Sequence, residues 1–428
     1  MRNYLVLLLV FLIPLTAKSQ NHSFPEFLKV VDQSLEEMSL PRLRLSYVHN
    51  LEQIPEADRR QTQGSQIKIL RQQLANFRLE DLELSAQLEW RLLDFELELQ
   101  EEYLNLSRGF EQNNIQGNGL AGEQNGKAWY AYFIKKWTGT QLDPDSVFQF
   151  GLGQIERVHQ GMEAIRKATG LSKIEFAKSL EKASFFESKV ATLEQIFAER
   201  QRKVEKALVG VYPPNSAIPS LSVLQGQDRS LSQVPGYYSS GNFYYNLFDY
   251  PFNLRQVDWL FLHEGNPGHH YQSTYAAQLK LPRYRRHLSY LGFQEGWAAY
   301  VEEFGAEAGL YESPYDYYGK WEWDLIRSVR VALDVGLNYY GWEEAEALAF
   351  WRQHISRQDD IGRREIQRML RWPAQVLTYK VGAAKILQLR QAEEKRLGSK
   401  FDPLSFHKQV LDAGAIPVGL LDFRFTKH

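Results

Sequence analysis

The sequence contains no cysteine, and this absence restricts both its stability and its chemistry. No disulfide can form, so an oxidising compartment would add no covalent cross-link. A bound metal would have to be held by histidine and carboxylate side chains alone. Since a lipoprotein anchor requires a cysteine at the cleavage point of the export signal, we expect no such anchor.

A strong net charge is also missing. The formal net charge is −2 over 428 residues, which gives no electrostatic reason to expect nucleic acid or an anionic membrane surface as a partner. After the first nineteen residues, no stretch is long and apolar enough to span a membrane. We therefore expect no integral membrane association. The sequence pattern does not indicate an oligomeric state.

Residues 1–19 have the features of a cleavable export signal. Arg2 supplies a positive start, residues 4–15 form a short apolar run, and Ala17 and Ser19 are small residues at the positions that a signal peptidase requires. We predict cleavage before Gln20, which would place the mature protein in the periplasm or outside the cell.

Helical periodicity dominates the chain on both sides of one irregular segment. Apolar residues recur near a 3.6-residue period from 24 to 106. The segment 212–252 instead carries proline, glycine and aromatic signals of turns and strands. We predict a mainly α protein with a small β element before the site, in which an N-terminal helical lobe (20–210) and a catalytic lobe (211–428) form one continuous domain. Further helices are predicted over residues 129–137, 144–169, 172–209 with a break near 184, 253–280, 293–310, 316–340, 342–356, 361–371, 375–397 and 402–412.

The most informative feature is the octapeptide at 263–270, His-Glu-Gly-Asn-Pro-Gly-His-His. In the H-E-x-x-H motif, two histidines one helical turn apart bind zinc and the glutamate acts as general base. Here Pro267 stands where the second histidine belongs, and its ring must break the helix. An unbroken helix would place His263 and His269 about 240° apart around its axis, whereas a break can bring both to one ion. We favour His269 as second ligand, with His270 as the alternative.

A catalytic zinc site requires a third protein ligand, and Glu295 is the strongest candidate. It lies on a stretch of small residues that permits close approach to a neighbouring helix. Glu302, seven positions further on, would orient a ligand histidine. Glu264 would then be the general base. A His–Glu pair that satisfies itself inside the core would explain the octapeptide as well, but it would leave Glu295 without a role.

The octapeptide resembles the motif of the bacterial and archaeal family called domain of unknown function 885 (DUF885), His-Glu-x-x-Pro-Gly-His-His-x-Gln. The likeness continues in the Glu-Gly-Trp-Ala-x-Tyr element at 295–300 and covers roughly residues 235–420. Membership would imply a mainly helical, zincin-like peptidase of the gluzincin type. Carried onto this sequence, the resemblance implies His263, His269 and Glu295 as zinc ligands and Glu264 as base.

The resemblance implies two further roles. Tyr379 is expected to stabilise an oxyanion. Arg330 is expected to pair with a substrate carboxylate, although a salt bridge to Asp334, one helical turn away, is an equal alternative. The chain departs from the family where relatives have histidine at Asn338 and glycine at Ala374. We expect the chemistry to survive these departures and substrate binding to change.

These features predict an exported zinc peptidase that cleaves small peptides, as a carboxypeptidase or an oligopeptidase. The alternatives are a metallohydrolase of another amide or ester, a non-catalytic binding protein on the same scaffold, and a metal-free glycosidase that uses Glu295 and Glu302. An intact Glu264 argues against the binding protein, and the paired histidines would be unexplained in the glycosidase.

Overall fold

The computed structural model describes residues 23–214 and 220–425, so the predicted signal peptide and its cleavage before Gln20 lie outside the described residues. Of the described residues, 68% are in helices and 5% in strands, which confirms the predicted mainly α class. Within the described ranges, no helix combines the length and apolarity needed to cross a bilayer. The helices are α1 (Phe24–Met38), α2 (Tyr47–Glu52), α3 (Ala57–Leu74), α4 (Leu84–Leu106), α5 (Gly126–Thr138), α6 (Pro144–Ala168), α7 (Lys173–Leu180), α8 (Val190–Ala207), α9 (Val257–Glu264), α10 (His269–Ala276), α11 (Leu291–Val301), α12 (Pro314–Val335), α13 (Glu344–His354), α14 (Asp359–Arg371), α15 (Leu377–Leu397), α16 (Pro403–Leu411) and α17 (Asp422–Phe425).

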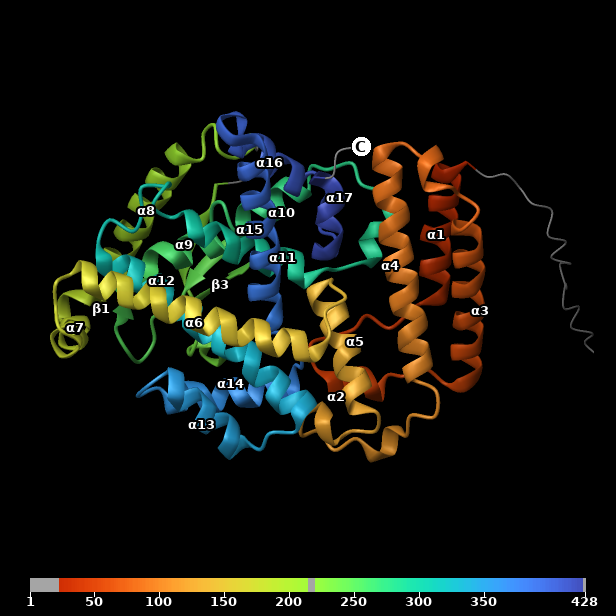
Figure 1. The fold of residues 1–428 in the computed structure, drawn as a ribbon, viewed down its shortest axis with the longest axis horizontal. Coiled ribbons are helices and arrows are strands. Elements are labelled where there is room, and N and C mark those ends of the chain that lie inside the picture. Colours follow the sequence, from red (N-terminus) through yellow and green to blue (C-terminus); the bar gives the residue numbers. More distant parts are fainter. Residues whose placement is uncertain (1–22, 215–219, 426–428) are drawn as a thin grey trace, which may run out of the picture.

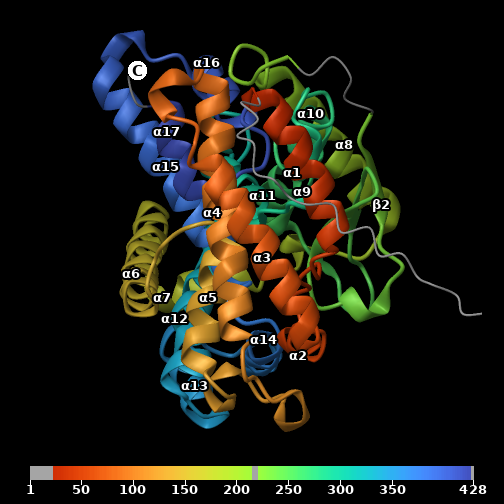
Figure 2. The same cartoon turned by 90° about the vertical axis from the view of Figure 1, so that its right-hand side faces the viewer.

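The first helices form a layer at one end of the molecule, where α1, α3 and α4 stand side by side (Figures 1 and 2). Buried Glu89 of α4 connects this layer to the rest of the chain, because its carboxylate accepts hydrogen bonds from Tyr284 and Arg285. One large apolar core includes Leu92 and Trp129 together with Trp297. Residues from both predicted lobes therefore share this core.

The predicted β element is confirmed as a small sheet of three strands with the order β2-β4-β3. β2 (Ser222–Gln225) runs parallel to β4 (Asn242–Tyr245), and β3 (Gly236–Ser239) pairs with β4 in the antiparallel direction. Two short strands, β1 (Phe186–Glu187) and β5 (Phe252–Asn253), form a separate pair. A second, smaller apolar core lies among this sheet, α8 and α9, and it holds α9 in place.

The predicted break inside the octapeptide is present. α9 ends at Glu264 and α10 begins at His269, so His263 lies on the first helix and His269 and His270 lie on the second. Gly268 allows this tight reversal, because a Cβ at that position would lie 2.0 Å from the carbonyl oxygen of His263. The indole N–H of Trp297, on α11, donates to the carbonyl oxygen of Pro267 at 2.8 Å. The turn between the histidines is therefore held by close backbone packing at Gly268 and by the hydrogen bond from Trp297.

Small residues on α11 allow the close packing that the sequence predicted. A Cβ on Gly296 would lie 2.5 Å from the Cα of Gly382 on α15, so the two backbones are in contact. The predicted helix 293–310 is too long, since α11 ends at Val301 and is followed by a single 3₁₀ turn. The predicted helix 316–340 is instead α12 with one π-helical turn at its end. In Figure 1, α9, α10 and α11 lie in the middle of the molecule.

Candidate metal centre

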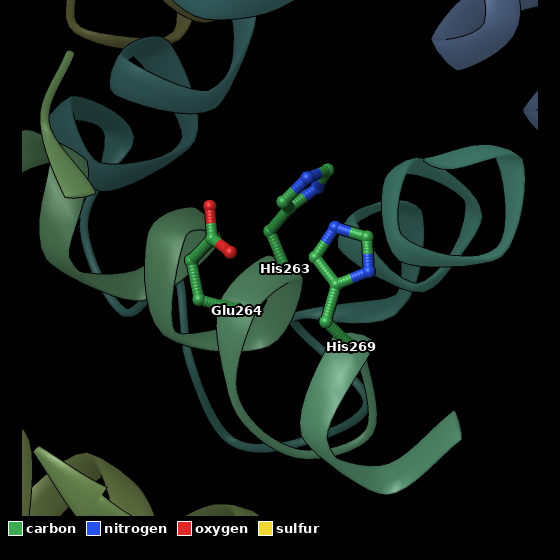
Figure 3. Close-up of side chains that lie close together, drawn as sticks. All are labelled: His263, Glu264 and His269. Atoms are coloured by element: carbon green, nitrogen blue, oxygen red, sulfur yellow. The ribbon is translucent and has the colours of Figure 1, made fainter. Parts of the chain in front are cut away.

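Two imidazoles and one carboxylate converge at the break between α9 and α10. The ring centroids of His263 and His269 are 4.8 Å apart, and Figure 3 shows the two rings side by side. The Nε2 atoms of His263 and His269 lie 3.6 Å and 3.3 Å from the same oxygen, Oε2 of Glu295. The structure therefore brings together all three residues that the sequence predicted as ligands.

Glu264 is the second carboxylate at this place. One ligand atom each of His263, Glu264 and His269 lies within 4.8 Å of the others. The Glu264 carboxylate stands beside the imidazoles (Figure 3), whereas Glu295 touches both Nε2 atoms. This difference favours Glu295 as the ligand and Glu264 as the base.

The spacing of these atoms fits a tetrahedral ion. Zinc binds nitrogen and oxygen at about 2.0–2.1 Å, so two ligand atoms of a tetrahedral site lie about 3.4 Å apart. The observed separations of 3.6 Å and 3.3 Å between the imidazole nitrogens and Glu295 match that value. Two histidines and one carboxylate are also a common donor set for catalytic zinc. The residues present therefore fit the ion that the sequence predicted.

The charges at the centre favour a cation. Burial raises the pKa of the Glu295 carboxyl, but His269 and His263 outweigh burial and hold that pKa well below its usual range. Burial and Arg327 lower the pKa of His263, yet hydrogen bonds that its imidazole donates to Glu295 and Glu302 raise it to about 9. The ionised carboxylate of Glu295 therefore lies where it can stabilise a positive charge between the two imidazoles.

Glu302 orients the imidazole of His263. Its Oε1 lies 2.7 Å from Nδ1 of His263, and an imidazole that donates from Nδ1 leaves Nε2 free for a metal. Arg327, a residue that the sequence analysis missed, contacts both oxygens of Glu302 at 2.7 Å. Glu302 is 1% exposed and does not line the cavity. It therefore lacks the access to substrate that the glycosidase alternative requires.

Replacing Glu302 with glutamine is expected to weaken zinc binding about 10- to 100-fold, because the amide orients His263 less firmly. The same change leaves the buried charge of Arg327 unbalanced, so the free energy of unfolding of the metal-free protein should fall by about 3 kcal/mol. A competing chelator and urea unfolding measure the two effects. Exposed Glu307 provides the matched control Glu307→Gln. An unchanged zinc affinity in Glu302→Gln would contradict the orienting role.

A cavity of about 560 Å³ opens onto the centre. His263, Glu264, His269 and Glu295 line it, and the ring of Tyr379 lies 6.2 Å from that of His263. This volume falls in the range of small-molecule sites. His270 does not line the cavity; it is fully buried, with Nδ1 3.3 Å from the hydroxyl of Tyr238.

Arg330 lines the cavity, but the predicted alternative of a salt bridge to Asp334 is wrong. The Arg330 guanidinium pairs with Glu365 of α14 at 3.0 Å. Asp334 accepts hydrogen bonds from the Tyr130 hydroxyl at 2.6 Å and the Ala374 N–H at 2.9 Å. Although Arg330 and Asp334 are one helical turn apart, the packed neighbours of α12 give each a different partner.

Asp334 gives a prediction for the pH dependence of stability. Burial raises the pKa of its carboxyl to about 7, so the folded protein keeps a proton that the unfolded chain releases near pH 4. The stabilising contribution of this proton to the free energy of unfolding is complete below the unfolded-state pKa, and it is lost as the pH rises to about 7. The free energy of unfolding of Asp334→Asn, relative to wild type, should therefore increase between pH 4.5 and pH 7.5, roughly the window that linkage sets. Urea unfolding at both pH values tests this, and a constant difference would contradict it.

Residues 22–424 match the family described as "Bacterial protein of unknown function (DUF885)". The chain belongs to this family. Two solved structures share its fold, each described as a "putative lipoprotein". The one from Colwellia psychrerythraea is 24% identical with a TM-score of 0.66 and covers 95% of this chain and 67% of its own. The one from Shewanella oneidensis is 16% identical with a TM-score of 0.73 and covers 94% and 99%. No curated protein matches the sequence.

The two departures from the DUF885 pattern are buried structural positions. Asn338 accepts a hydrogen bond from the N–H of Leu120 at 3.0 Å and donates to the carbonyl of Met369 at 3.1 Å. It does not line the cavity, so its position gives no support to the expected change in substrate binding. Ala374 has a φ of 64°, in the left-handed region, which explains why this position of the DUF885 pattern favours glycine.

Three arginines of α14 also line the cavity, and neither sequence patterns nor DUF885 membership predicted them. Arg364, Arg368 and Arg371 project from α14 into the wall of the cavity. Their spacing of four and three residues places them on one face of a helix, and this spacing is a signal that the sequence did contain. Because they lie far from the octapeptide along the chain, the sequence did not indicate that they share a cavity with it.

Proposed function

We propose that this protein is an exported zinc-dependent peptidase of zincin-like architecture that hydrolyses small peptides. The observation that carries the proposal is the approach of two imidazole nitrogens to one carboxylate oxygen, at 3.6 Å and 3.3 Å, with Glu264 beside them. Export is supported by the apolar N-terminal segment and by structural relatives that are described as lipoproteins. The cavity volume of about 560 Å³ suits a short peptide.

Separate side chains would hold the metal, transfer the proton and stabilise the oxyanion. His263, His269 and Glu295 would hold the ion. Bound zinc would act as a Lewis acid and lower the pKa of water at the site. Glu264 would accept the proton of the attacking water and pass it to the leaving amine. Tyr379, on the cavity wall near His263, would donate a hydrogen bond to the oxyanion that develops on the peptide carbonyl.

Metal analysis and a peptide library test the proposal together. Protein purified without chelators should contain about one zinc per chain and should cleave a mixed library of short peptides. Removal of the metal should abolish cleavage, and added zinc should restore it. Cleavage that persists in protein shown to be free of metal would contradict the proposal. Bound metal with no cleavage of any peptide would instead favour a metallohydrolase of another bond or a binding protein.

A further inference from the structure

Besides Arg327, which pairs with Glu302, four arginines line the cavity. Arg330 projects from α12, and Arg364, Arg368 and Arg371 project from α14. We call these four residues the arginine wall. Arginine presents a planar fork of N–H donors that binds carboxylates with two parallel hydrogen bonds.

One carboxylate, Glu365, is shared among three members of the wall. It lies 3.0 Å from Arg330, 3.0 Å from Arg364 and 3.7 Å from Arg368. Among the described residues, no carboxylate lies within salt-bridge distance of Arg371, whose Nε donates to a backbone carbonyl. The wall therefore carries more positive charge than its protein partners neutralise, in a cavity where charges are less screened than in bulk water.

The interior of the wall retains unused donors. Arg330 is 2% exposed, and its Nε has no hydrogen-bond partner among the described residues. The Nε of Arg368 is also buried without a partner. Burial lowers the pKa of the Arg330 guanidinium, and the nearby Arg368 acts in the same direction. An anion in the cavity would relieve this concentration of positive charge.

The ring of Tyr379 lies near both the arginine wall and the imidazole of His263. The guanidinium carbon of Arg330 lies 5.3 Å from the centroid of the Tyr379 ring, and that ring lies 6.2 Å from the ring of His263. An extended peptide spans about 3.5 Å per residue. A group one or two residues from the bond that is cut would therefore reach the wall.

We propose that the arginine wall binds a carboxylate of the peptide substrate, one or two residues from the scissile bond. This inference rests on the proposed peptidase function and names its substrate class as anionic peptides. The carboxylate comes either from the free C-terminus of the peptide or from an aspartate or glutamate side chain. Both sources present the same group to the same donors.

Four matched peptides distinguish the two sources. They combine glutamate or glutamine at the residue after the scissile bond with a free or an amidated C-terminus. We expect kcat/KM to be about 10- to 150-fold higher when the recognised carboxylate is present, as for a hydrogen bond between charged groups. A preference that follows the terminus assigns the α-carboxylate, and one that follows glutamate assigns the side chain. Equal cleavage of all four peptides would overturn the inference and leave the peptidase function intact.

Variants test whether the wall causes the preference. Arg371→Gln and Arg364→Gln should reduce kcat/KM for charged peptides at least about tenfold and change that for the neutral peptide little. The matched control is Arg363→Gln, since Arg363 lies on the same helix, pairs with Glu344 and does not line the cavity. A charge preference that survives in both wall variants would overturn the inference.

Calorimetry separates this inference from the peptidase proposal. Wild-type protein should bind N-acetyl-glutamate more tightly than N-acetyl-glutamine amide, and Arg371→Gln should lose the difference. Binding of N-acetyl-glutamate that depends on Arg371, without cleavage of any peptide, would overturn the peptidase and support an anion-binding wall. Absence of that binding together with absence of a charge preference would overturn the wall.

Discussion

Replacing Glu264 with glutamine is expected to reduce peptide cleavage by a factor on the order of 10²–10⁴, the usual contribution of a general base. Glutamine has the same shape but cannot accept the proton of the attacking water. Because Glu264 is not the carboxylate that touches both imidazoles, the variant should keep about one zinc per chain, as expected for a site with three other ligands. Cleavage of the library and metal content measure the two quantities in one preparation.

Glu295→Gln is the matched comparison for this experiment. Loss of zinc is expected there, since an amide is a weaker ligand than a carboxylate, and cleavage should fail because the metal is missing. If Glu264→Gln loses the metal and Glu295→Gln retains it, the two carboxylates exchange roles. The short distances among His263, Glu264 and His269 make this comparison necessary.

Replacing His269 with alanine is expected to weaken zinc binding by a factor on the order of 10² or more, because one of three protein ligands is lost. The neighbouring change His270→Ala should leave zinc affinity within a few-fold of wild type. The structure separates the two histidines clearly: His269 lies 3.3 Å from Glu295, whereas His270 is fully buried beside Tyr238. Zinc affinity is measured by competition with a chromogenic chelator.

Stability must be followed in both variants, since His270 is enclosed on all sides and its removal creates a cavity in the core. A lower melting temperature in His270→Ala is compatible with the assignment as long as the folded protein binds zinc. Retention of zinc by His269→Ala, with loss in His270→Ala, would show that the second ligand has been misidentified.

Local sequence signals predicted much of the fold and the centre. Pro267 required a break, and the structure has one between Glu264 and His269. The proline and aromatic signals of 212–252 correctly indicated the small sheet. Small residues around Gly296 correctly indicated close helix packing. Each of these features depends on residues that are near one another in the chain.

Partners that meet only in the folded state were not predictable in the same way. Arg330 lies one turn from Asp334, yet it pairs with Glu365 of another helix. Arg327 has no sequence signal that connects it with Glu302, since packing of α12 against the 3₁₀ turn after α11 decides that contact. The arginines of α14 were visible as a helix face, but the sequence did not show that this face borders the centre.

Three consecutive residues of α11 perform three separate tasks. Glu295 contacts both histidines, Gly296 lies against the backbone of α15, and Trp297 holds the turn that separates the two histidines. α15 also carries Tyr379. The positions of Tyr379, Glu295 and the turn before His269 therefore all depend on contacts with α11. A small rotation of α11 would displace a ligand and the ligand-bearing turn in the same direction. The geometry of the centre therefore depends on the packing of α11 against α10 and α15.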